Sequence, residues 1–192
     1  ETETIARDLD AEVRGAAIAS VEVARPDVLR GVSARALTSR LAGASLTRVH
    51  RRAKSIVLDL GSSGRLVVTP RFTGALLIDG TPDDRYTCLT FQLTDGRLLR
   101  YHDVRRLGTV AWYDAEGFAA WDAALGPEPL EPTLTDSGFA TMLRGSRRAV
   151  KTLLMDQRRL AGVGNIYANE ALWRAGVRPT RRGTTITSVQ AG

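Results

Sequence analysis

The chain has 192 residues, of which 43% are hydrophobic and 25% are charged, proportions that are typical of a soluble globular protein. Its net charge of +6 and its pI of about 10.2 are expected of a protein that binds a polyanion, although basic proteins with other partners also exist. One cysteine, Cys88, excludes an internal disulfide, and with only His50 and His102 it cannot complete a structural zinc site. No apolar run approaches membrane length and no signal peptide is visible, so a cytoplasmic location is expected.

The first part of the chain is rich in predicted strands. Apolar residues at helical spacing predict a helix over residues 3–14, and residues 18–23 alternate like a strand. Ser33 suits the N-cap of a short helix that carries Leu37 and Leu41 on one face. Seven further strands are expected near residues 45–50, 54–60, 65–69, 74–79, 86–93, 97–102 and 108–113. Many short strands with tight turns, such as Asp95-Gly96, predict an antiparallel sandwich or barrel.

The pattern becomes helical after residue 114. A helix is predicted over residues 114–125, a Pro-rich connector follows it, and further helices are expected near residues 136–144, 146–156 and 165–175, with one more beginning at Thr187-Ser188. The predicted fold class is α+β, with an antiparallel β-sandwich flanked by helices and a separate helical domain. We expect a sandwich domain over 1–117, a linker over 118–132 and a helical domain over 133–192.

The most informative stretch opens the helix near residues 165–175. A tight Gly162-Val-Gly turn places Asn165 at the mouth of that helix, where backbone N–H groups and a side-chain amide suit an anion such as phosphate. The alternative is a helix corner that serves only packing. Tyr167 and Trp173, later in the same helix, are interpreted as core residues.

The segment LMDQRRLAGVGNIYANEALWRAGVRP resembles the helix–two-turns–helix core of the formamidopyrimidine-DNA glycosylase/endonuclease VIII family, and more closely its formamidopyrimidine-DNA glycosylase branch. The segments ETETIARDL, RRAKSIVLDL, LRYHDVRRLGTV and LGPEPL match other parts of that family in the same order. The resemblance implies a base-excision-repair enzyme that flips oxidised purines, such as 8-oxoguanine and formamidopyrimidine, out of duplex DNA, removes them and nicks the abasic site. The alternatives are a catalytically inactive relative that binds lesions or abasic sites, and an RNA-binding module.

The resemblance also implies which residues carry the chemistry. The family's nucleophile is the amine of an N-terminal proline, and a glutamate beside it handles protons; neither residue is in the sequence. Both ends are expected to be truncated relative to the family, whose four-cysteine zinc finger is also missing, so structural zinc is expected only if the full protein has that finger. Glu1 and Glu3 match acidic positions that would act in active-site electrostatics, or they are charges favoured by a helix dipole.

Several basic and polar residues match DNA contacts of the family. Lys54 matches the lysine that binds the phosphate of the flipped nucleotide, and Asn165 and Arg106 would bind phosphates beside it. Lys151 matches a lysine near the damaged-base pocket. The alternatives are a solvated charge cluster at a strand end for Lys54 and an exposed helical lysine for Lys151. The implied partner is damaged double-stranded DNA, bound by a monomer that is associated with the nucleoid and not with a membrane.

An enzyme that extrudes a base must fill the hole that the base leaves. The family uses three side chains from two loops, and here Phe72 stands at the usual methionine, Leu107 replaces the usual phenylalanine wedge, and Arg105 would hydrogen-bond the orphaned cytosine. The alternative is two hairpin loops with ordinary core plugs. Thr69-Pro70 replaces the usual histidine-leucine, which removes one expected phosphate contact and stiffens the loop. The two changed wedge residues put the strength of opposite-base selectivity in question.

Overall fold

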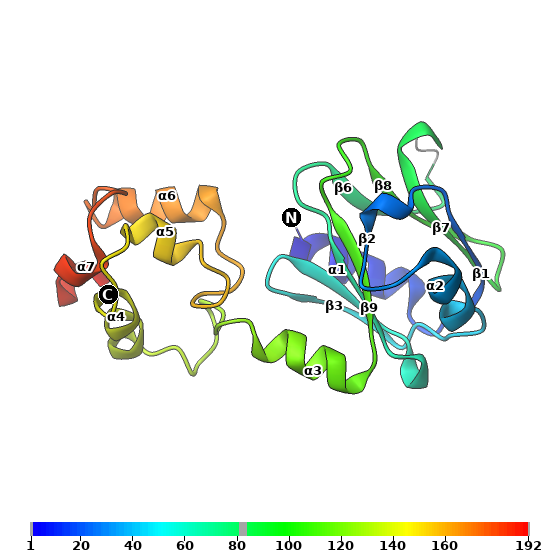
Figure 1. Cartoon of the computed structure of the whole chain (residues 1–192), viewed down its shortest axis with the longest axis horizontal. Coiled ribbons are helices and arrows are strands. Elements are labelled where there is room, and N and C mark those ends of the chain that lie inside the picture. Colours follow the sequence, from blue (N-terminus) through cyan, green and yellow to red (C-terminus); the bar gives the residue numbers. More distant parts are fainter. Residues whose placement is uncertain (1, 81–83, 192) are drawn as a thin grey trace. The chain divides into compact units, whose positions relative to one another are not determined.

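The structure is a computed structural model that describes residues 2–80 and 84–191. The chain divides into two compact units, Glu1–Ala119 and Ala120–Gly192, and each is described by itself. The strands gather in the first unit and helices α4 to α7 lie in the second (Figure 1). The division falls inside helix α3 (Ala115–Ala123), while the sequence-based domain boundaries remain predictions.

The first unit contains two β-sheets, as the sequence pattern predicts. One sheet has four antiparallel strands in the order β1 (Ile18–Val23), β7 (Thr87–Leu93), β8 (Leu98–Asp103) and β6 (Gly74–Ile78). The other has the order β2 (Leu29–Arg30), β9 (Thr109–Tyr113), β5 (Arg65–Thr69), β4 (Ser55–Asp59) and β3 (Arg48–Arg52), and only the β2–β9 pair is parallel. The predicted α+β class with antiparallel strands is confirmed.

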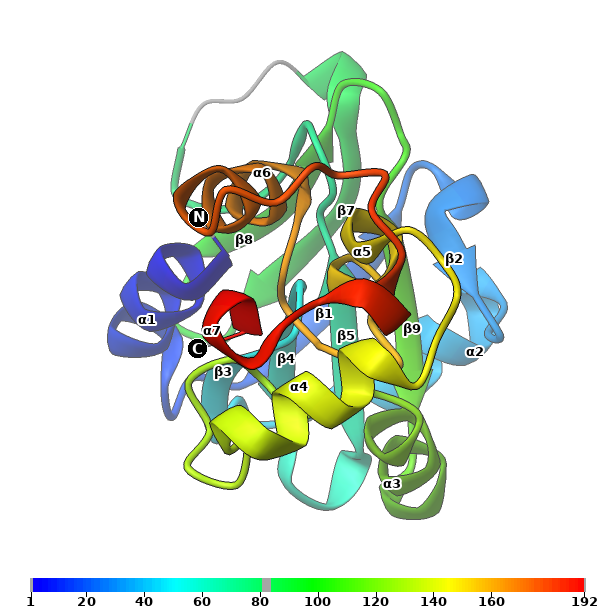
Figure 2. The ribbon, with the colours of Figure 1, turned by 90° about the vertical axis from the view of Figure 1, so that its left-hand side faces the viewer.

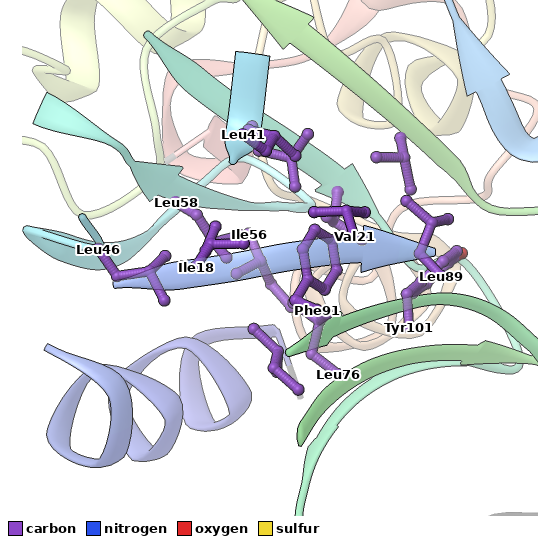
Figure 3. Close-up of a cluster of buried hydrophobic side chains, with 14 of the residues drawn as sticks. Ile18, Val21, Leu41, Leu46, Ile56, Leu58, Leu76, Leu89, Phe91 and Tyr101 are labelled. Atoms are coloured by element: carbon purple, nitrogen blue, oxygen red, sulfur yellow. The ribbon is translucent and has the colours of Figure 1, made fainter. Parts of the chain in front are cut away.

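Hydrophobic side chains from both sheets form the core of this unit (Figure 3). Strand β4 lies between β3 and β5 and buries four successive residues, which is why its sequence is an apolar run rather than an alternation. The largest fully buried side chains are Tyr101 and Phe91. The hairpin at Asp95-Gly96 forms as expected, because Gly96 takes a φ of 91° and the Asp95 carboxylate accepts the N–H of Arg97 at 3.1 Å.

Two helices cover apolar parts of the sandwich. Helix α1 (Thr2–Val13) buries Ala6, Leu9 and Val13 in the core. Helix α2 (Ala34–Leu41) begins at the predicted N-cap, since the N–H of Ala36 donates to Ser33 Oγ at 3.2 Å. Single 3₁₀ turns join other elements at Pro26–Val28, Gly61–Ser63, Asp84–Tyr86 and Gly183–Thr185.

The second unit is helical, with α4 (Asp136–Arg144), α5 (Val150–Leu154), α6 (Asn165–Arg174) and α7 (Ser188–Ala191). Helix α5 lies beside α6 (Figure 1), and α4 lies beside α7 (Figure 2). Its core is formed by Leu143, Val150, Leu153, Leu154, Leu160, Ala168, Leu172, Val177 and Ile186. This unit therefore has a hydrophobic core of its own.

The helix predicted over residues 146–156 is wrong in its length, because only 150–154 are helical. The backbone before it pairs with a distant segment instead. Ala149 forms an isolated bridge with Arg182, and the N–H of Val150 donates to the carbonyl of Arg181 at 2.7 Å. This long-range pairing replaces the first predicted helical turn.

The interpretation of Tyr167 and Trp173 as core residues is also wrong, since they are 74% and 84% exposed. Ala168 and Leu172 form the buried stripe of α6, four residues apart, and both aromatic side chains lie outside that stripe. The aromatic character of these two side chains therefore did not identify the buried face of α6.

Candidate nucleic-acid interface

Two loops lie side by side at one end of the sandwich. Residues 70–73 connect β5 to β6, and residues 104–108 connect β8 to β9. Thr69 pairs with Thr109, and Gly74 pairs with Asp103, so sheet register brings both ends of the two loops together. These are the loops that, by the family resemblance, are expected to enter a base stack.

A buried carboxylate organises the second loop. Asp103 has no exposed surface, and its Oδ2 accepts the Gly108 N–H at 2.8 Å and the Tyr101 hydroxyl at 3.2 Å. Burial alone would raise the pKa of Asp103, but the hydrogen bonds from Thr73, Gly108, Tyr101 and Arg105 together hold that pKa below its ordinary value. The carboxylate is thus kept charged and fixes both ends of its loop.

Thr73 joins the two loops to each other. Its hydroxyl donates to Asp103 Oδ1 and accepts the backbone N–H of Arg105 at 3.1 Å. Gly108 completes this arrangement, because a Cβ there would lie 1.9 Å from the Tyr101 hydroxyl oxygen. Hydrogen bonds through Thr73 and Asp103 therefore hold the two loops together, and the two loops (residues 70–73 and 104–108) are termed here the loop clamp.

The loop clamp presents the predicted wedge residues outward. Phe72 is 78% exposed and Leu107 is 42% exposed, which is unusual for large apolar side chains. The guanidinium carbon of Arg105 lies 5.5 Å from the centre of the Phe72 ring, within the range of a cation–π contact. The structure thus brings Phe72 and Arg105 into contact and places Leu107 on the same loop as Arg105.

Further positive charges lie at this end of the sandwich. Lys54 occupies the β3–β4 turn, where Ala53 has a φ of 54°, and the neighbouring Ser55 Oγ lies 2.7 Å from Thr69 Oγ1 at the start of the first loop. Burial, and then the positive charge of Arg71, hold the pKa of Lys54 below its ordinary value. Two neighbouring cations, of which Lys54 is partly buried, favour an anionic partner.

Two other predicted residues already have partners. Arg106 adopts a φ of 50° and its guanidinium lies 3.4 Å from the Asp27 carboxylate, where both side chains are about half exposed. Glu3 accepts a hydrogen bond from Arg51 Nε at 2.8 Å, which ties α1 to β3. Glu1 lies outside the described residues.

In the helical unit, Asn165 is the first residue of α6 and is exposed. Gly164 is the N-cap and contributes no side-chain cap, so the first turn of α6 keeps N–H groups for another acceptor. Asn165 and Lys151 line the same open cavity of about 740 Å³, together with Arg148. The structure thus brings two predicted DNA-binding residues together around one basic depression.

Sequence reasoning missed the residues that hold these sites in place, namely Asp103, Thr73 and, in the helical unit, Asp156 and Gln157. Arg148 donates to Asp156 at 2.7 Å, and this hydrogen bond lowers the pKa of the Asp156 carboxyl. The buried Glu128 was also not singled out. An aspartate at the start of the Asp103-Val-Arg-Arg-Leu-Gly loop was the one signal in the sequence that could have pointed to Asp103.

Within residues 2–80 and 84–191, no group of three or more His, Cys, Asp or Glu side chains could hold a metal ion. In the same part of the chain, every helix is too short or too polar to cross a membrane. An exposed aromatic–arginine pair on hydrogen-bonded loops, a partly buried lysine and an open helix N-terminus are typical of a nucleic-acid-binding protein.

Comparison with known proteins identifies the family of nucleic-acid-binding proteins to which the chain belongs. Residues 1–110 match the formamidopyrimidine-DNA glycosylase N-terminal domain, and residues 125–192 match the formamidopyrimidine-DNA glycosylase H2TH domain. The chain belongs to the formamidopyrimidine-DNA glycosylase family. The family resemblance seen in the sequence is confirmed.

Individual relatives agree with this assignment. The chain is 36% identical to a formamidopyrimidine-DNA glycosylase of Carboxydothermus hydrogenoformans over 100% of this chain and 70% of the relative, and 40% identical to that of Roseiflexus over 98% and 70%. It is similar to the Lactococcus lactis enzyme bound to abasic-site DNA, with a TM-score of 0.91 and 27% identity over 100% of this chain and 74% of the other. The same enzyme with Fapy-dG-containing DNA gives a TM-score of 0.90 and 27% identity, over 99% of this chain and 73% of that one.

Proposed function

We propose that the protein is a base-excision-repair DNA glycosylase that removes oxidised purines, such as 8-oxoguanine and formamidopyrimidine, from duplex DNA by base flipping. Family membership and the likeness to an enzyme solved with Fapy-dG-containing DNA support this substrate class. The observation that carries the proposal is the exposed Phe72–Arg105 pair on the loop clamp. The DNA is bound by a monomer, in the nucleoid.

The roles of the wedge residues follow from the cost of extruding a base. Removing a nucleotide from the stack leaves a hole and an unpaired partner base. Phe72 and Leu107 are apolar, already exposed and able to fill the hole. Arg105 has five fixed N–H donors, which suit the Watson–Crick edge of the partner. Because Arg105 already rests beside Phe72, both side chains enter the stack from one prepared position.

The phosphate contacts position the DNA without reading its sequence. Lys54, Arg106 and Asn165 bind phosphates, and Lys151 lies beside Asn165 at the same depression. Binding by Arg106 requires its exposed ion pair with Asp27 to open, which costs little because such pairs contribute at most about 1 kcal/mol. The partly buried Lys54 loses less hydration on binding than a fully exposed lysine would.

We further propose that base removal is followed by cleavage of the strand at the abasic site. The family resemblance assigns the nucleophile to the amine of a proline ahead of Glu1. An α-amino group has a pKa of about 8, against about 10.4 for lysine, so a useful fraction is neutral near pH 7. That amine attacks the sugar carbon as the base leaves and forms a Schiff base, from which elimination cuts the strand. Glu1 and Glu3 act as nearby acidic groups.

The test is base release from duplexes that carry a single 8-oxoguanine or formamidopyrimidine, with an undamaged duplex as control. Treatment with hot alkali after the reaction reveals every abasic site, whether or not the protein cuts it. The proposal predicts lesion-dependent release by the full-length protein. Tight binding to the lesion without release would instead indicate a catalytically inactive lesion-binding relative.

A further inference from the structure

The side-chain amide of Gln157 forms hydrogen bonds to the turn that leads into α6. Gln157 donates from Nε2 to the carbonyl of Met155 at 2.9 Å and to the carbonyl of Val163 at 3.0 Å. Its Oε1 accepts the N–H of Gly162 at 2.9 Å. Three hydrogen bonds from a single amide thus span the Gly162-Val-Gly turn immediately before Asn165.

The orientation of this amide is determined by its partners. Met155 and Val163 offer carbonyl oxygens, which need a donor, and Gly162 offers an N–H, which needs an acceptor. If the amide were flipped, its oxygen would face the two carbonyl oxygens and its NH₂ group would face the N–H. Both N–H groups of the amide are used inside the protein. Gln157 borders the basic depression, yet it has no donor left for a phosphate.

The backbone of the same residue connects a second segment. The N–H of Gly126 donates to the carbonyl of Gln157 at 2.9 Å, and the N–H of Ala161 donates to the carbonyl of Pro127 at 2.9 Å. A Cβ at Gly126 would lie 2.5 Å from the backbone of Arg159, so only glycine permits this approach. Gln157 therefore joins the Pro-rich connector, the end of α5 and the turn before α6.

We propose that Gln157 is a positioning residue for DNA binding, which fixes the turn so that the Asn165 side chain faces a phosphate. This rests on the proposed function, in which Asn165 binds DNA. Without the amide, the carbonyls of Met155 and Val163 lose their common donor, and Gly162, whose φ is 90°, regains the freedom of a glycine-rich loop. Asn165 then has to be ordered by the DNA itself, at a cost in affinity.

The experiment is a double-mutant cycle on binding to a duplex with one tetrahydrofuran abasic site. Gln157→Met keeps the length of the side chain and removes its hydrogen bonds. We expect Gln157→Met to weaken binding about fivefold and Asn165→Ala to weaken it about tenfold, as expected when a phosphate hydrogen bond is loosened or lost. The double variant should bind within about twofold of Asn165→Ala alone, because Gln157 acts through Asn165. A purely structural role would not produce this coupling.

Two controls make the coupling interpretable. Gln92→Met makes the same change at an exposed position of β7 and should leave binding unchanged. Gln157→Met combined with Lys54→Ala should give the product of the two single effects, since these residues lie in different units. If Gln157→Met does not fold, Gln157→Glu, which keeps the acceptor and loses both donors, takes its place in the same cycle.

Independent effects of Gln157→Met and Asn165→Ala, or unchanged affinity for Gln157→Met, would overturn the positioning role. A failure of the proposed function would look different. In that case the wild-type protein would not release the lesion base, whatever the coupling between Gln157 and Asn165.

Discussion

A single buried carboxylate sets the geometry of the lesion-facing loops. Asp103 receives hydrogen bonds from a hydroxyl on the first loop, from two backbone N–H groups of the second loop and from a core tyrosine. Such a group is costly to bury unless every oxygen is satisfied, so its presence marks a place where loop geometry matters. The backbone N–H of Arg105 donates to the Asp103 carboxylate, and the Arg105 guanidinium contacts the Phe72 ring.

Replacing Asp103 by asparagine should therefore damage both stability and recognition. The new NH₂ group would face donors, which we expect to destabilise the sandwich by about 2 kcal/mol. The folded pKa of Asp103 is depressed, so its stabilisation is present above the unfolded pKa of about 3.9 and is lost as the pH falls through the folded value. Urea unfolding from pH 7 to pH 3 should show a smaller acid-induced loss in Asp103→Asn than in wild type. Parallel pH profiles for the two proteins would contradict this role.

A second single-residue variant, Lys54→Ala, tests the proposed phosphate contacts. Lys54→Ala should weaken binding to lesion DNA and to undamaged DNA alike, because a phosphate contact carries no sequence information. The slope of log K against log salt should fall by roughly one. Arg35→Ala, which removes an exposed charge from α2, is the matched control. Equal salt slopes for wild type and Lys54→Ala would remove Lys54 from the interface.

At the scale of elements, sequence patterns identified most strands and helices but not the contacts that bind loops together. The alternation in β1 and the N-cap at Ser33 depend on local chemistry, and both were predicted. The two-residue strand β2 is too short to carry a pattern. Thr73 and Asp103 lie 30 residues apart, and no periodicity in the sequence links them.

In the site too, the sequence identified some residues and only the structure revealed the others. The resemblance to the family located Phe72, Arg105 and Asn165, and the structure brings Phe72 to Arg105 and Asn165 to Lys151; their roles on DNA stay predictions. Gln157 was not found, because a glutamine in a polar turn gives no signal until the positions of three distant backbone groups are known.

Helix α6 offers a direct test of which of its faces is buried. Leu172 is 5% exposed and Trp173 is 84% exposed. Leu172→Ala should destabilise the helical unit by about 2–4 kcal/mol, whereas Trp173→Ala should change its stability by less than about 0.5 kcal/mol. Chemical unfolding followed by circular dichroism measures both variants. A larger loss for Trp173→Ala than for Leu172→Ala would show that the assigned buried face of α6 is wrong.

At the scale of the whole molecule, the proposed chemistry depends on an amine ahead of Glu1. Full-length protein that begins with proline should be trapped on abasic-site DNA by borohydride, which reduces the Schiff base to a stable bond. The 192-residue form that begins at Glu1 should be trapped weakly or not at all. Efficient trapping of that form would move the nucleophile to another amine, either the α-amine of Glu1 or an internal amine such as Lys54, whose pKa is lowered.

The central claim is that the loop clamp serves an extruded base, and Arg105 tests it most directly. The measurement is single-turnover excision of 8-oxoguanine opposite each of the four bases, compared with nicking of a ready-made abasic site, with full-length wild type, Arg105→Ala and the control Arg35→Ala. Unmet polar groups cost about 1–3 kcal/mol each, so excision by Arg105→Ala should fall at least about fivefold and lose its preference for cytosine. Nicking of the abasic site should suffer much less, because part of the unstacking cost is already absent. Unchanged excision rates with an unchanged opposite-base preference would contradict this account.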